Sequence, residues 1–367
     1  MKITDIRLWK LSVPLRVPFK TALRTVYRVE DVVVEVRTDE GAVGWGEAPP
    51  TGKITGDTFS GIVGAIRDHI APSVIGREVE ALEPLLQTIQ SCVVKNTSAK
   101  AAVDMAVWDL YGQKYGLPVY RLLGGGRTRI ETDITISVND PEVMAEDTRE
   151  AIRRGYGCLK VKVGANPALD VRRLAAVREA AGADTILRID ANQAWQPKEA
   201  VRILNAMQDR GLDIEFVEQP VAAHDFEGLK YVTERSSVPV LADESVFSPA
   251  DALKIMQMGA ADLINIKLMK CGGLYPALQI ASAAEVYGVP CMIGCMLEAK
   301  ISVNAAVHLA CARGIITKID LDGPVLCSED PVLGGAVFAE KDITVSDAPG
   351  LGVRGVEQGY LTLIPEN

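Results

Sequence analysis

Five short apolar stretches, each with a charged side chain at or next to its end, follow one another between residues 159 and 267 and decide the fold. They are Leu159-Lys160-Val161-Lys162-Val163, Leu187-Arg188-Ile189-Asp190, Ile214-Glu215-Phe216-Val217-Glu218, Val240-Leu241-Ala242-Asp243 and Ile264-Asn265-Ile266-Lys267. The charged ends recur roughly every 24 to 28 residues, about the length of one strand–helix unit in an α/β protein. A buried strand that ends on a charge is costly unless that charge has a partner or a task. We therefore interpret the five ends as parts of one site.

The regular alternation extends in both directions from this stretch. After Gly124-Gly125-Gly126 we expect a first strand from Ile130 to Ser137, and helices that begin at Pro141, Pro197 and Pro249. Two further strands are expected at Cys291 to Leu297 and Ile316 to Leu321. Eight strands with seven intervening helices predict an α/β fold, a modified (β/α)7β barrel whose last unit lacks a clear helix.

The first part of the chain has a different rhythm. Two β-rich segments, Ile3 to Val13 and Val29 to Thr38, precede a return strand through Val43 to Glu47, and a helical pattern runs from Thr58 to about Tyr115. We predict an α+β capping domain at 1–125, the barrel at 126–322 and a tail at 323–367 that packs back on the cap. Two cap loops, at 20–28 and 51–56, can fold over a site on the barrel.

Composition narrows the possible partners. The chain has 367 residues, 48% of them hydrophobic, and a net charge of −9 without a dense run of Lys or Arg. This balance disfavours nucleic acid and anionic membranes as partners. No apolar run is long enough to cross a bilayer, and the N-terminus lacks a signal-peptide core. Seven cysteines without a Cys-x-x-Cys motif predict reduced thiols and a cytoplasmic protein.

The charged ends predict a metal-assisted acid–base site. Lys160 and Lys162 lie two residues apart on a strand, so both side chains face the barrel mouth. Asp190, Glu218 and Asp243 lie on consecutive strands and suit a hard dication such as Mg²⁺. Lys267 comes from the opposite wall, which gives a metal-bound substrate an acid–base group on each face.

Proton removal next to a carboxylate needs these parts. A cation holds the enediolate charge, and a base must be neutral at rest. We expect neighbouring ammonium groups near a dication to lower a lysine pKa towards the useful range. Any one of these residues alone is more often a salt-bridge partner than a catalyst. The agreement of five strand ends in phase and in chemical order favours a functional origin.

The motifs resemble those of the enolase superfamily, in its muconate-lactonising subgroup. The quoted elements are Lys160-x-Lys162, Asp190-x-Asn192, Glu218-Gln219-Pro220, Asp243-Glu244-Ser245, Asn265-x-Lys267 and, in the cap, Gly44-Trp45-Gly46-Glu47. The resemblance implies Mg²⁺ on the three carboxylates, with Lys162 and Lys267 as acid/base groups and Lys160 as an electrostatic neighbour. The mandelate-racemase branch uses a His–Asp pair, and none of the three histidines here falls at a predicted strand end.

The eighth strand narrows the reaction. Asp320 and Asp322 lie in phase at the mouth, where a substrate ammonium would satisfy both. This Asp-x-Asp resembles dipeptide epimerases, in which the pair holds the free amine of a dipeptide. The alternative is an acid pair that caps helix N-termini. The o-succinylbenzoate synthases and muconate cycloisomerases of the subgroup act on substrates without such an amine.

Specificity residues are suggested by resemblance alone. The stretch from Phe19 to Val26 resembles the capping loop of L-Ala-D/L-Glu epimerases, in which an arginine at the Arg24 position pairs with the glutamate side chain. Thr135 and Ile54 resemble further pocket residues. Glu298, just past the seventh strand, either supports the site or favours a cationic side chain.

The predicted function is Mg²⁺-dependent epimerisation of a dipeptide at its C-terminal residue, with L-Ala-D/L-Glu as the best candidate and salvage of cell-wall peptides as the setting. Synthase or cycloisomerase activity on the same lysines is the enzymatic alternative. A non-catalytic, metal-bearing barrel is the remote rival, although it gives no reason for three lysines. Among similar proteins multimers are common, so we expect a homo-oligomer.

Overall fold

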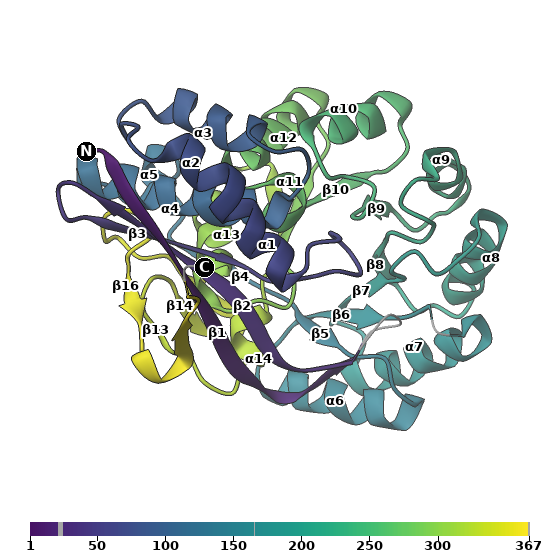
Figure 1. Ribbon diagram of the computed structural model, residues 1–367. Coiled ribbons are helices and arrows are strands. Elements are labelled where there is room, and N and C mark those ends of the chain that lie inside the picture. The colour runs from purple at the N-terminus through teal and green to yellow at the C-terminus, as the bar shows by residue number, and fades with distance from the viewer. Residues whose placement is uncertain (21–24, 165, 366–367) are drawn as a thin grey trace.

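The computed structural model describes residues 1–20, 25–164 and 166–365, and a parallel barrel dominates it (Figure 1). Eight strands form one sheet in the order β12-β11-β10-β9-β8-β7-β6-β5. Asp133 N donates to Ile319 O at 3.4 Å, which links the two outer strands and nearly closes the sheet. The strands are β5 (Ile134–Ile136), β6 (Cys158–Lys162), β7 (Ile186–Asp190), β8 (Ile214–Glu218), β9 (Val240–Ala242), β10 (Leu263–Ile266), β11 (Cys291–Gly294) and β12 (Ile316–Asp320).

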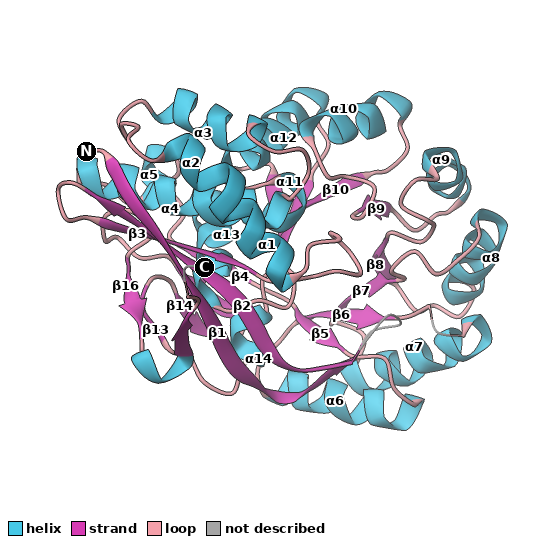
Figure 2. Ribbon diagram, viewed as in Figure 1, coloured by secondary structure: helices cyan, strands magenta, loops and turns pink. Residues whose placement is uncertain are grey.

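Helices follow the strands and cover the outside of the barrel (Figure 2). Local chemistry sets their ends: in α10, Ser248 Oγ accepts from Asp251 N at 3.1 Å, and Gly259 closes the helix at a φ of 59°. The barrel helices are α6 (Pro141–Arg153), α7 (Pro167–Ala181), α8 (Pro197–Gln208), α9 (Phe226–Arg235), α10 (Pro249–Met258), α11 (Leu268–Cys271), α12 (Leu274–Tyr287), α13 (Lys300–Ala312) and α14 (Gly323–Leu326). The predicted modified barrel is confirmed, and its last helix is the short α14.

The cap consists of an antiparallel sheet with helices packed on it. The sheet order is β17-β1-β2-β3, from β1 (Ile3–Lys20), β2 (Thr25–Thr38), β3 (Val43–Ala48) and β17 (Leu361–Leu363). Gly44 and Gly46 let α4 approach β3, because a Cβ at Gly46 would lie 1.8 Å from Ala102 O. The helices are α1 (Phe59–Ala65), η1 (Ile66–Ile70), α2 (Ala71–Val74), α3 (Leu82–Ser91), α4 (Thr97–Tyr115) and α5 (Val119–Leu122).

The end of the chain returns to the cap. β17 pairs antiparallel with β1, so the last described residues lie on the edge of the cap sheet. The remaining small elements are β4 (Arg129–Glu131), β13 (Val332–Gly334), β14 (Val337–Ala339), β15 (Asp342–Thr344), β16 (Val353–Val356) and η2 (Gln358–Tyr360).

Some predicted boundaries are wrong. The stretch from Ile130 to Ser137 is not one strand: β4 pairs with β15 in a separate sheet, and only β5 joins the barrel. The break follows from Asp133, whose carboxylate turns to Arg188 at 2.6 Å. β1 and β2 also extend further towards the hairpin tip than expected, with Lys20 paired to Thr25. One of the two irregularities in their register lies between Pro14 and Phe19, where proline is tolerated.

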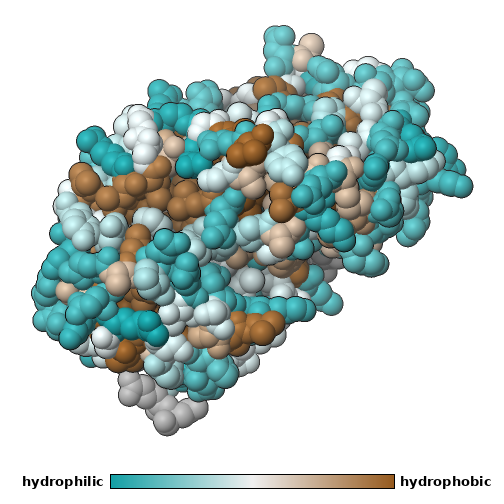
Figure 3. All heavy atoms as spheres, turned by 90° about the horizontal axis from the view of Figure 1, so that it is seen from above, coloured by the Kyte–Doolittle hydropathy of each residue, from teal (hydrophilic) through white to brown (hydrophobic). Residues whose placement is uncertain are grey.

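In the face shown in Figure 3, hydrophilic side chains predominate, and apolar ones lie between them, most continuously toward the left of the view. Among the described residues, we find no helix that combines the length and the apolarity a bilayer crossing requires. Cap residues at 51–56 lie at the mouth of the barrel, because Ile54 lines the same cavity as Lys160 and Lys267.

Candidate active site

The carboxyl ends of the parallel strands bring the predicted charged residues to one end of the barrel. Lys162 is paired in register with Asp190, and Asp190 with Glu218, across three neighbouring strands. Asp243 directly follows β9 and Lys267 directly follows β10. All of these side chains are buried. The charged residues that were predicted to meet because each lies at a strand end are therefore close together in space.

The three lysines face the carboxylates. Lys160 Nζ lies 2.7 Å from Glu218 Oε2, Lys162 Nζ lies 2.6 Å from Asp190 Oδ2, and Lys267 Nζ lies 2.7 Å from Asp243 Oδ2. Burial disfavours the charge on Lys160 and Lys267, but the neighbouring carboxylates outweigh it and raise both pKa values. This direction is opposite to the lowering we expected from ammonium repulsion. Such lowering requires positive charge that neutralises the carboxylates.

The carboxylates respond to the same contacts. Burial favours protonation of Asp190, yet Lys162 and Lys160 outweigh it and lower its pKa to about 2. Burial and Asp190 raise the pKa of Glu218 to about 7. The pKa of Asp243 is lowered, because Lys267 and a further lysine, Lys270, oppose its burial. Asp190 and Asp243 are therefore held as charged carboxylates, whereas Glu218 is more readily protonated.

The donor set suits a hard cation. Within the described part of the chain, no three acidic, thiol or imidazole side chains converge closely enough to hold a metal ion as they stand. Glu218 Oε2 and Asp243 Oδ1 are nevertheless buried oxygens that accept no hydrogen bond, although an ammonium lies within ion-pair distance of each. Three carboxylates, two of them with such an oxygen, fit Mg²⁺ chemically, in exchange for the lysine contacts.

Supporting polar residues surround the ligands. Asn265 Nδ2 donates to Glu218 Oε1 at 2.9 Å, and Gln219 Oε1 accepts from Asp243 N at 2.9 Å. Lys270, which the sequence reading missed, is fully buried: its Nζ lies 2.5 Å from Asp243 Oδ1 and donates to Asn265 O at 2.9 Å. Its position three residues after Lys267, on one turn of α11, is the signal that could have found it.

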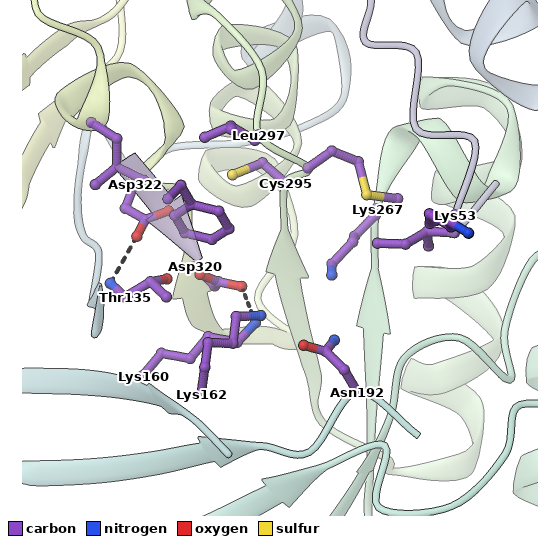
Figure 4. Close-up of a pocket in the computed structure, with 14 residues that line it drawn as sticks. Lys53, Thr135, Lys160, Lys162, Asn192, Lys267, Cys295, Leu297, Asp320 and Asp322 are labelled. Atoms are coloured by element: carbon purple, nitrogen blue, oxygen red, sulfur yellow. Dashed lines mark hydrogen bonds and ion pairs between the residues drawn. The ribbon is translucent and has the colours of Figure 1, made fainter. Parts of the chain in front are cut away.

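Asp320 and Asp322 lie in the same cavity as the lysines (Figure 4). Asp320 Oδ2 lies 2.7 Å from Lys160 Nζ, and Asp322 Oδ2 accepts from Thr135 N at 2.8 Å. Burial and Asp320 raise the pKa of Asp322 to about 6. Lys160 and Lys267 lower the pKa of Asp320 despite its burial. Asp320 is thus held as a charged carboxylate, whereas Asp322 is more readily protonated.

Of the four remaining predicted pocket residues, two line the cavity, one does not, and one lies outside the described residues. Thr135 and Ile54 line the cavity, as does Lys53, which the sequence reading did not single out. Glu298 is not among the described lining residues: it is buried, and its Oε1 accepts from Met296 N at 2.7 Å. Arg24 lies outside the described residues.

Family models and curated relatives match most of the chain. The model of the family described as mandelate racemase/muconate lactonizing enzyme, N-terminal domain, matches residues 3–124, and that described as enolase C-terminal domain-like matches residues 143–358. The L-Ala-D/L-Glu epimerase of Clostridium acetobutylicum is 58% identical over 97% of this chain and 99% of its own.

Solved structures of dipeptide epimerases also match most of the chain. A substrate-liganded complex of the L-Ala-D/L-Glu epimerase from Bacillus subtilis matches with a TM-score of 0.96 at 47% identity, covering 97% of this chain and 99% of that chain. A dipeptide epimerase from Enterococcus faecalis, complexed with Mg and the dipeptide L-Leu-L-Tyr, matches with a TM-score of 0.92 at 42% identity, covering 96% and 99%.

Proposed function

The chain belongs to the mandelate racemase/muconate lactonizing enzyme family of the enolase superfamily, and from that premise we propose that it epimerises dipeptides at the α-carbon of the C-terminal residue. The carrying observation is one cavity that the three strand-end lysines, Lys160, Lys162 and Lys267, line together with Asp320 and Asp322. The lysines serve proton transfer, and the Asp pair accepts a free amine. L-Ala-D/L-Glu is the proposed substrate, consistent with the names of the relatives.

We assign proton transfer to Lys162 and Lys267. They come from β6 and from the end of β10, four strands apart in the sheet order, so a substrate between them presents opposite faces to the two Nζ atoms. One lysine, neutral at the start, takes the α-proton. The other, protonated at the start, returns a proton to the other face. Lys160 contributes positive charge beside them.

Asp190, Glu218 and Asp243 are the residues that would hold Mg²⁺. A cation held there would supply positive charge that stabilises the enediolate formed from the substrate carboxylate. Asp243 and Glu218 now raise the pKa of Lys267, so their engagement by a cation would favour the neutral amine of Lys267, whereas Lys160 would keep Asp320 beside it and stay charged. Asp320 and Asp322 hold the dipeptide ammonium and thereby fix the α-carbon between the two bases.

Proton NMR in D₂O tests the proposal. With the protein and Mg²⁺, L-Ala-L-Glu should gain deuterium at the glutamate α-carbon while the D-epimer accumulates. The Asp320→Asn/Asp322→Asn double variant should lose most of this exchange. Silence of the wild type across a dipeptide library would refute the epimerase assignment. Full activity of the double variant on an o-succinylbenzoate precursor or a muconate would favour the synthase or cycloisomerase alternative.

We further propose that the enzyme is a cytoplasmic homo-oligomer that acts in salvage of cell-wall peptides. The names of the relatives support the dipeptide substrate on which this setting is based, and light scattering after size-exclusion chromatography tests the assembly. A non-catalytic scaffold would show no α-proton exchange with any dipeptide, which separates that rival in the same experiment.

A further inference from the structure

The N-terminus of α13 is capped by side chains from the cap domain. Ala299, the N-cap residue, offers no side-chain acceptor. Asp31 Oδ2, on β2, accepts instead from Ala299 N at 3.1 Å, and Glu47 Oε2, on β3, accepts from Ser302 N at 2.9 Å and from Ser302 Oγ at 3.0 Å. The first N–H groups of a barrel helix are therefore satisfied from more than 250 residues away in sequence.

This cluster is buried and acidic. Asp31 is 1% exposed, Glu47 0% and Glu298 4%. Burial raises all three pKa values, that of Glu298 to about 7, while backbone N–H donors lower them. Buried carboxyl groups are costly without donors, and a helix N-terminus supplies them. Asp31 therefore depends on the position of Ala299, the last residue of the segment that precedes α13, and Glu47 depends on the first turn of α13 that follows it.

That segment is a wall of the substrate cavity. Cys295, Met296 and Leu297 line the cavity, and Figure 4 shows Cys295 and Leu297 on the side of Asp322 and Asp320. Cys295 N donates to Asp320 O at 3.1 Å. The wall thus adjoins the pair that we assign to the substrate amine, and so it faces the N-terminal residue of a bound dipeptide.

We infer that Asp31 and Glu47 are positioning residues that act from the cap sheet on the 295–297 wall and thereby limit the size of the N-terminal side chain that the cavity accepts. The inference rests on the proposed function for its substrate. Neither carboxylate lines the cavity, so any effect on selectivity travels through α13 and the wall.

Glu47→Ala tests the inference against a matched control. Asp109 is an equally buried cap carboxylate that accepts from Leu351 N at 2.7 Å and from Trp45 N at 3.0 Å, and it does not line the cavity. Asp109→Ala therefore removes a similar buried anchor without touching the wall. Glu47→Gln keeps an oxygen acceptor for Ser302 and should behave like the wild type.

Two readouts separate positioning from general destabilisation. In Glu47→Ala, iodoacetamide should alkylate Cys295, identified by peptide mass spectrometry, about tenfold faster than in the wild type, because the wall opens locally. The ratio of kcat/KM for L-Ala-L-Glu over L-Leu-L-Glu should fall by about tenfold, the scale on which apolar pockets discriminate side-chain size. Asp109→Ala should change neither.

The alkylation readout needs no activity. If the wild type turned over no dipeptide, the proposed function would fail, while the contrast in Cys295 alkylation would still decide the positioning role. Equal alkylation rates and equal selectivity in Glu47→Ala and Asp109→Ala would overturn the inference. Should Glu47→Ala not fold, Ser302→Ala, which removes only the hydroxyl donor, carries the same expectations at smaller amplitude.

Discussion

Gly294, the last residue of β11, leaves the space through which Lys267 reaches the cavity. A Cβ at Gly294 would lie 2.9 Å from Lys267 Cε and 2.9 Å from Asn265 Oδ1. Ordinary van der Waals contact begins at 3.4 Å, so both side chains would have to move by roughly half an ångström. Asn265 is held by Glu218, and Lys267 by Asp243. Gly294→Ala therefore displaces a proton-transfer group and the support of a proposed metal ligand together.

We expect Gly294→Ala to lower kcat/KM by about 10- to 100-fold, because a displacement approaching 1 Å in an active site costs about 100-fold. Overpacking of a buried site should lower the free energy of unfolding by about 1–3 kcal/mol. The exchange of the epimer whose α-proton faces Lys267 should fall more than that of the other epimer, which uses Lys162.

The assay is deuterium exchange in D₂O, run separately on L-Ala-L-Glu and L-Ala-D-Glu. Gly314→Ala is the control, because a Cβ there meets nothing within 4 Å. If Gly294→Ala matched Gly314→Ala in both exchange rates, the argument that Lys267 depends on this space would be wrong. An equal loss for both epimers would place the damage at Glu218 rather than at Lys267.

Three further predictions concern stability. Burial lowers the pKa of His308 from 6.5 to about 4, so the unfolded chain binds a proton that the native state rejects; the contribution of His308 to the unfolding free energy should fall by about 3 kcal/mol between pH 6.5 and 4, measured in urea as the difference between the wild type and His308→Gln, because buried acids with raised pKa values such as Glu298 oppose this loss in both proteins. Arg188→Met should cost about 3–5 kcal/mol in the same assay, because it leaves Asp133 buried without the ion pair at 2.6 Å; a loss below 1 kcal/mol would contradict this. Mg²⁺ at 100 times its Kd should stabilise the protein by about 2.7 kcal/mol, seen as a rise in Tm that Asp190→Asn reduces.

The strand ends were predictable because their information is local. A parallel strand aims its last side chains at the mouth, so the recurrence of Lys162, Asp190 and Glu218 after each helix already implied that they meet. Asp320 and Asp322 followed by the same argument. No long-range pairing had to be known for these residues, because closure of the barrel supplies it.

The features that were not predicted depend on tertiary contacts, which the spacing of residues along the sequence does not reveal. Glu298 follows a barrel strand like the other acids, yet its carboxylate turns back to Met296 N instead of entering the cavity. Asp133 broke the first predicted strand because its partner, Arg188, lies two strands away. Glu47 caps α13 across the domain boundary. In each case the tertiary partner outweighs the local pattern.

The charge balance at the mouth explains why one site can take both a dication and an ammonium ion. Four buried lysines face a larger set of buried carboxyl groups: Asp190, Glu218, Asp243, Glu244, Asp320 and Asp322. With every group ionised, two negative charges stay uncompensated. The protein shows this excess in raised pKa values, about 7 for Glu218, 8 for Glu244 and 6 for Asp322, to which burial and neighbouring carboxylates contribute. Positive charge brought by Mg²⁺ or by a substrate amine relieves the same excess, so through this charge alone the binding of each should weaken the binding of the other.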